Sequence, residues 1–192
     1  IFPMEFEMDA AERIIKGDII LDLLKPVSYR AMLFCRMLGT AGMEFAATFV
    51  LVGGIYLFVN GIQYLDFFRT VLFFIALLMG MGVKFCIQYL FSLMCFYTDN
   101  AYGVSKARET LTNFFSGALV PLAMFPGILR EAVNFLPFRG IVYTPCCIFI
   151  GFFSIRESIF NILLQLVWIL VLGGLGTLLG KKAFSVISMY GG

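Results

Sequence analysis

The sequence predicts an all-α, polytopic membrane protein, and three observations support that fold class. Hydrophobic residues make up 61% of the 192 residues, whereas charged residues make up only 14%. The mean hydropathy is +0.96, so the chain has more apolar surface than one soluble core of this size can bury. The apolar residues also fall in long runs separated by turn signals, which is typical of helices that cross a bilayer.

Residues 1–30 are predicted to form a cytoplasmic amphipathic segment that precedes a transmembrane domain of residues 31–192. Gly17 is placed to end a first short helix, Asp18 to cap a second and Pro26 to stop it. The result would be a compact elbow tied to membrane helices, which a transmembrane subunit needs if a soluble partner is to push it. A simple helix on the membrane surface is the alternative.

Four segments are predicted to span the membrane, at about 37–59, 70–97, 104–125 and 158–180. The first two should pair as an antiparallel hairpin through the turn signal at Asn60–Gly61. The third is short, because about 15 apolar residues at a rise of about 1.5 Å do not cross a hydrocarbon core about 30 Å thick. The fourth carries Gly176-x-x-x-Gly180, whose small flank favours packing within the chain over a dimer contact.

Residues 126–153, between the third and fourth spans, are apolar but interrupted by proline and glycine. Irregular backbone cannot face lipid, because its N–H and C=O groups would have no partners. This segment is therefore predicted to form short re-entrant or interfacial helices on the outer side. Within it, residues 127–136 separate apolar side chains from Arg130, Glu131 and Asn134, as in a helix that lies flat at the surface.

The distribution of positive charge predicts the orientation. If residues 1–30 are cytoplasmic, nine of the 14 Lys and Arg residues lie inside and four lie outside. This excess agrees with the positive-inside rule and places the C-terminus in the cytoplasm.

Polar residues inside the expected spans are the candidate functional positions. Glu44 and Lys84 are predicted either to line a substrate path or to form a structural pair across the hairpin. Ser116, Gly117 and Pro121 predict a kink in the third span, which would be either a hinge or a static bend.

The sequence gives little support to an enzyme. The chain has no histidine, and its Gly-rich residues 173–182 do not match the phosphate-binding pattern G-x-x-x-x-G-K-[ST]. No catalytic, cofactor-binding or metal-binding residues are predicted. The net charge of +2 is too small to indicate a nucleic-acid partner, and the five cysteines show no disulfide framework.

Several strings, in order along nearly the whole chain, resemble the bacterial type-2 ABC transporter permeases. They are KGDIILDLLKPVSY at 16–29, FYTDNAYG at 96–103, FSGALVPL at 115–122 followed by Phe125–Pro126, NFLPF at 134–138 and YGG at 190–192. The resemblance implies an exporter-type transmembrane subunit of the bacterial cytoplasmic membrane, without a cofactor. It would form a homodimer or heterodimer with a second permease subunit and be driven by a separate ATP-binding subunit.

The resemblance also assigns roles to residues. The coupling element that contacts the ATP-binding subunit would comprise Lys16, Gly17, Asp18, Asp22, Leu23, Leu24, Lys25 and Pro26. Thr98, Asp99 and Asn100 would form a cytoplasmic loop, in which Asp99 or Asn100 caps the next helix.

Two further expectations complete the sequence-based interpretation. The family fold has six spans, and the two that precede the coupling element are missing here, so the chain is expected to be N-terminally incomplete. The alternative function is a membrane scaffold or assembly factor that binds a cytoplasmic partner without transport. The substrate is not indicated by any motif.

Overall fold

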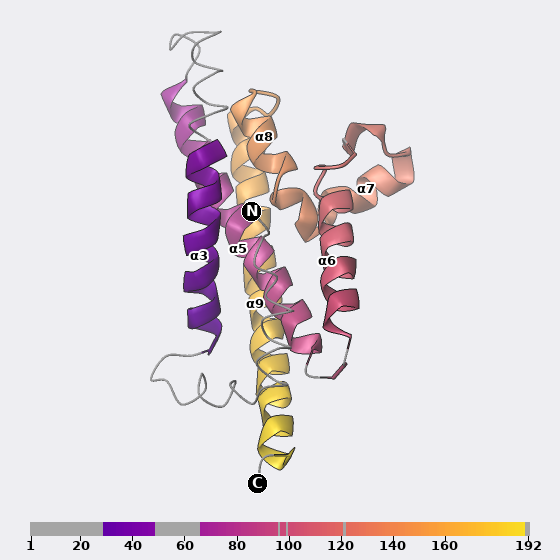
Figure 1. Ribbon diagram of the computed structural model, residues 1–192. Helices are drawn as coiled ribbons and strands as arrows, with labels where there is room; N and C mark the ends of the chain where they lie inside the picture. Colours follow the sequence, from indigo (N-terminus) through magenta and orange to yellow (C-terminus); the bar gives the residue numbers. More distant parts are fainter. Residues whose placement is uncertain (1–28, 49–65, 96, 99, 121, 191–192) are drawn as a thin grey trace.

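The computed structural model describes residues 29–48, 66–95, 97–98, 100–120 and 122–190. Its described part is all-helical, and Figure 1 shows long helices beside a group of short ones. The long helices are α3 (Tyr29–Thr48), α5 (Phe67–Met94), α6 (Ala101–Phe115) and α9 (Ile155–Tyr190). The short elements are the 3-10 turn η3 (Leu122–Met124), α7 (Gly127–Phe135), the 3-10 turn η4 (Pro137–Gly140) and α8 (Tyr143–Phe149).

Side-chain caps explain where the long apolar helices begin. The carboxylate of Asp66 accepts a hydrogen bond from the Phe68 amide at 3.1 Å and so caps α5. At the start of α9, the Ser154 amide donates to Glu157 at 2.8 Å and the Glu157 amide donates to Ser154 at 3.3 Å. This reciprocal pair is a capping box, and it satisfies two amides that the first helical turn would otherwise leave without partners.

Among the described residues, two helices are long and apolar enough to cross a membrane: α5, and α9 over Ile155–Lys181. The span expected at 104–125 is not one helix, because α6 ends at Phe115 and is followed by turns. The helix expected at 37–59 begins earlier, at Tyr29, and its described part ends at Thr48. Four membrane-spanning helices therefore remain a prediction.

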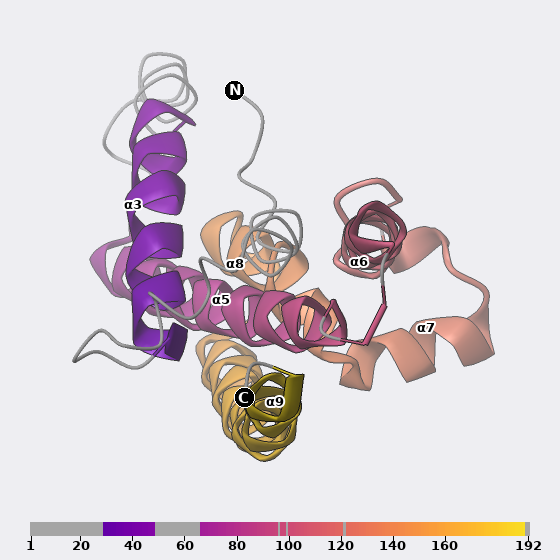
Figure 2. The same ribbon diagram turned by 60° about the horizontal axis from the view of Figure 1, so that its bottom comes forward.

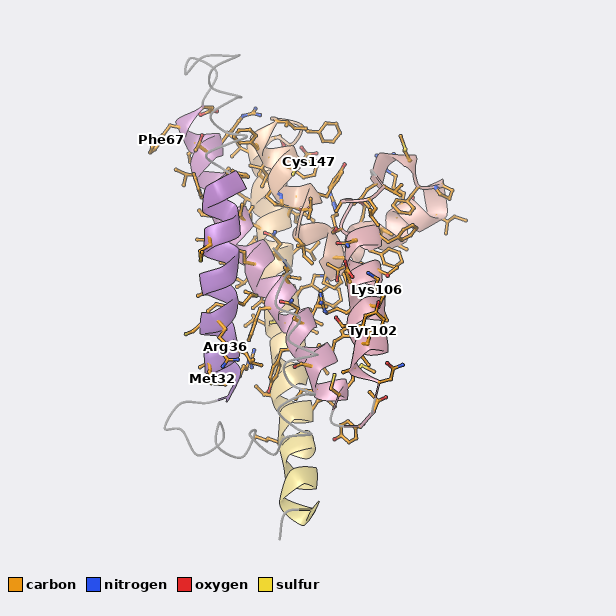
Figure 3. The ribbon with its side chains drawn as sticks, in the orientation of Figure 1. Met32, Arg36, Phe67, Tyr102, Lys106 and Cys147 are labelled. Carbon is orange, nitrogen blue, oxygen red and sulfur yellow. The ribbon has the colours of Figure 1, made fainter. Side chains whose placement is uncertain are left out.

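The long helices alternate in direction. In Figure 3, Met32 of α3 and Tyr102 of α6 lie low, and Phe67 at the start of α5 lies high. Figure 1 places the C-terminal end of α9 at the lower end as well. The start of α3, the end of α5, the start of α6 and the end of α9 thus share one end of the molecule.

Helix α5 is the centre of the fold. Figure 2 shows it between α9 on one side and α8 on the other, with α3 and α6 at its flanks, and α5 contacts each of these helices. Two apolar clusters follow its length. One joins Leu72 and Ala76 to Ile148 of α8, and the other joins Phe85 and Tyr89 to α3.

The small flank of α9 packs within the chain, as the glycine pattern predicts. A Cβ atom on Gly176 would lie 2.9 Å from the Tyr89 ring, so the ring of α5 uses the space that a side chain would fill. One turn earlier, the carbonyl of Gly173 accepts a hydrogen bond from Arg30 at 3.2 Å. The Arg30 guanidinium also lies over the Tyr89 ring, 5.6 Å from its centroid, so α3, α5 and α9 meet at this point.

Candidate functional site

The described residues include only part of the predicted site. The coupling residues Lys16 to Pro26 lie outside them, as do Asp99 and Pro121. Glu44 lies in α3, but its side chain is also outside the description, so the expected pairing with Lys84 is not tested.

The connection between α5 and α6 contains a helix cap. The side chain of Asn100 accepts a hydrogen bond from the Gly103 amide at 2.9 Å, and the Thr98 hydroxyl accepts one from the Asn100 amide at 3.4 Å. Asn100 therefore has the capping geometry expected of it. The connection lies at the end of the molecule where α3 starts, which is the point at which residues 1–28 join the described chain.

Helix α6 buries a row of polar side chains. Ser105, Arg108 and Thr112 are all buried and recur every three or four residues, so they lie on one face. Ser116 continues this row immediately after the helix and is 1% exposed. In contrast, Leu111 is exposed. In a lipid environment, such a polar face must be directed toward protein or toward water.

Helix α5, which contacts α6, carries a second row of polar residues. Lys84, Gln88 and Ser92 are four residues apart; the first is half-buried and the other two are buried. The row on α6 and the row on α5 are called the polar rows below. Helix α9, which also contacts α5, buries a further set of polar side chains, Ser158, Asn161 and Gln165.

Several atoms of the polar rows are buried without hydrogen-bond partners. They are Gln88 Oε1, Thr112 Oγ1 and Ser116 Oγ. An unsatisfied buried polar atom costs about 1–3 kcal/mol, so clusters of them indicate places where water or a ligand supplies the missing bonds. The polar rows are therefore a candidate wall of a substrate path.

A kink was predicted at Ser116, Gly117 and Pro121. Instead of bending there, helix α6 ends just before these residues. Gly117 has φ +84°, a left-handed conformation that favours glycine, and α6 stops two residues before it. The Ser116 carbonyl then accepts a hydrogen bond from the Tyr143 amide at 3.2 Å. The turn after α6 is thus joined to the short helices by a hydrogen bond, and it is not a bend within one continuous span.

Helix α7 and the turn η4 are attached to the long helices by side chains that the sequence analysis did not select. Gln165, 3% exposed on α9, donates from Nε2 to the carbonyls of Ala76 at 3.0 Å and Gly140 at 2.6 Å. Trp168 donates from Nε1 to the carbonyl of Phe135 at 2.9 Å. A search for every polar residue inside an apolar run would have found Gln165 as a candidate, although not its partners.

A close backbone contact supports the same attachment. A Cβ atom on Gly80 of α5 would lie 2.7 Å from the Gly140 carbonyl oxygen. The turn η4 therefore fits against α5 only because residue 80 has no side chain. The turn also contacts α9, so this irregular backbone packs against the two most apolar helices, which is the packing that a re-entrant segment would need.

The family model described as "ABC-2 family transporter protein" matches residues 1–186. No curated protein and no solved structure matches the chain.

Proposed function

Because this chain belongs to the ABC-2 transporter family, we propose that it is the permease subunit of an ATP-driven exporter. The family match covers residues 1–186, which include the predicted coupling element and every described helix except the last four residues of α9, and this observation carries the proposal. The chain itself would supply the substrate path and no catalytic group. A separate ATP-binding subunit would hydrolyse ATP.

The arrangement of the helices supports coupling at one end of the molecule. Residues 1–28 join α3 at the end where the connection between α5 and α6 lies and where α9 finishes. A soluble subunit bound to Lys16–Pro26 would therefore be close to several helix ends at once. We place this end in the cytoplasm of a bacterium, in agreement with the distribution of Lys and Arg.

The polar rows support a path through the membrane region. Families of this type work as dimers, and we propose that a second permease subunit, identical or related, completes the path. In this proposal Lys84 and the buried hydroxyl groups of α6 face the path and keep it hydrated. Ser116 and Gly117, at the end of α6, would let the short helices move relative to that path.

The coupling assignment is tested by charge reversal in the full-length protein. Lys16→Glu combined with Lys25→Glu should abolish recovery of the ATP-binding subunit, because like charges would face each other across the contact. The double variant Lys181→Glu and Lys182→Glu is the matched control, since it makes the same change in net charge outside the coupling element. Both variants should insert into the membrane. If the two variants recover the ATP-binding subunit equally well, residues 16–26 are only a surface anchor.

A further inference from the structure

Arg139 lies in the turn η4, at the wall of a small cleft between η4 and α9. The cleft has about 10 Å³ of free volume, roughly the space for one water molecule. Its polar lining consists of Asn134, Arg139, Thr144, Asn161, Gln165 and Trp168. The side chain of Arg139 is half-buried, whereas arginine is mostly exposed in proteins unless it is paired.

The partners of Arg139 are aromatic rings rather than carboxylates. Its guanidinium carbon lies 5.2 Å from the ring centroid of Tyr143 and 5.5 Å from that of Phe153. Its one hydrogen bond to the described protein is a long one, from Nη1 to the Asn134 carbonyl at 3.4 Å. The Nε atom is buried and has no acceptor. Aromatic faces attract the cation but accept few of its five N–H groups.

The charge around Arg139 is unbalanced. Burial lowers the pKa of the Arg139 guanidinium; Tyr143 and Cys147 oppose this change, and Arg130 adds to it. Among the described residues, no carboxylate contributes to this change in pKa. Arg130, on α7, is exposed, and the neighbouring Glu131 forms no ion pair with either arginine in the described structure. A desolvated cation without a counter-ion is costly, so an anion that reaches it should bind.

We propose that Arg139, with Arg130 beside it, binds a phosphate group at the mouth of this cleft. The guanidinium fork matches the oxygen spacing of a phosphate, which accepts two parallel N–H bonds and carries the missing negative charge. The phosphate has two possible sources, a phospholipid headgroup and a soluble phosphate. The exposed apolar side chains of α7, Ile128 at 90% and Phe135 at 69%, would contact acyl chains beside such a headgroup.

Trp168 gives a direct measurement of binding. It is the single tryptophan of the chain and lines the same cleft as Arg139, so its fluorescence reports on this place alone. The full chain, purified in a neutral detergent, is titrated with dioctanoylphosphatidylglycerol, with inorganic phosphate and with dioctanoylglycerol, which lacks the phosphate. We expect a saturable change with the phospholipid and none with dioctanoylglycerol. A saturable change with inorganic phosphate would show that the soluble anion suffices, and its absence would identify the lipid headgroup.

Variants separate this site from a general effect of surface charge. Arg139→Gln should weaken the phospholipid affinity about tenfold or more, since it removes a charged hydrogen-bond donor, and Arg139→Lys should retain part of it. The control, Arg156→Gln, removes an exposed charge at the start of α9 and should leave the affinity unchanged. Without ligand, Arg139→Gln should melt no lower than the wild type, because it removes a half-buried cation that has no counter-ion among the described residues. The proposal is wrong if no phosphate compound saturates, if dioctanoylglycerol acts as well as the phospholipid, or if Arg139→Gln and Arg156→Gln lose affinity equally.

Discussion

Gln165 shows how one side chain can make irregular backbone compatible with a membrane. It lies about 15 Å along α9 from Ile155, and its side chain is 3% exposed. Bulk water therefore hardly competes for the carbonyls of Ala76 and Gly140, and Gln165 donates to both. The two bonds fix the amide orientation, so Nε2 faces the carbonyls and Oε1 is left without a partner.

Replacing Gln165 by leucine should therefore destabilise the protein by about 1–3 kcal/mol, because the Gly140 carbonyl loses its side-chain donor and the Ala76 carbonyl its second donor, while the volume of the side chain is nearly kept. The loss should appear as a lower melting temperature of the purified protein. Thr177→Val is the control, since the exposed Thr177 hydroxyl bonds only to a carbonyl of its own helix, that of Gly174. Equal melting temperatures for the two variants would contradict the role assigned to Gln165.

At the scale of single residues, the sequence predicted some of the polar positions and missed others. Lys84 was selected because it is charged, and in the structure it is half-buried on α5. Asn100 was selected because it precedes a helix, and it caps α6. Gln165 and Arg139 were missed because their importance depends on contacts between segments far apart in the chain. No local pattern shows that a glutamine in an apolar run faces a turn 25 residues away.

At the scale of elements, the contact between η4 and α5 depends on Gly80. Gly80→Ala should displace η4 and lower the stability by about 1–3 kcal/mol, because the new methyl group would meet the Gly140 carbonyl, which is backbone and cannot turn aside. Gly174→Ala is the matched control: a Cβ atom there has no neighbour within 4 Å, and alanine favours the helix. Thermal unfolding of both variants checks this pair. A Gly80→Ala protein as stable as Gly174→Ala would mean that η4 does not pack against α5 this closely.

The polar rows lead to a prediction about water access. In a protein without native cysteines, cysteines at Gln88 and Thr112 should react with a water-soluble thiol reagent if the rows line a hydrated path. Cysteines at Leu78 and Leu111, which lie on exposed apolar positions of the same two helices, should react far more slowly because lipid covers them. Equal labelling of all four positions, or labelling of the leucine positions alone, would rule out a path at the polar rows.

The order of the elements could be predicted from the sequence, whereas several of their ends could not. Long apolar runs correctly indicated α5 and α9. The length and composition of a segment are enough to show that a helix there is long and apolar enough to cross a membrane. The third span was wrongly predicted to continue to Phe125, because the apolar run itself continues that far. In the structure, α6 ends at Phe115. The deciding feature there is the left-handed conformation of Gly117, which a glycine permits but does not require.

At the scale of the whole molecule, the alternating helix directions predict the sidedness. Single cysteines at Tyr102 and Lys181 should be protected from a membrane-impermeant reagent in intact cells, and one at Glu131 should react. All three positions are exposed in the structure, so differences in labelling report the side of the membrane. Lysed cells provide the control, in which all three should label. Labelling of Tyr102 together with Glu131 in intact cells would contradict the arrangement.

The central claim is that this chain is a permease that works with a separate ATP-binding subunit. The most direct test is to isolate the full-length protein, under mild conditions, from the membrane of the cell that makes it, and to identify what comes with it. We predict recovery of a protein that carries G-x-x-x-x-G-K-[ST], in about equal amount, and ATP hydrolysis by the isolated complex. Recovery of the intact chain with other partners but without such a protein or any ATP hydrolysis would contradict the claim and favour a membrane scaffold.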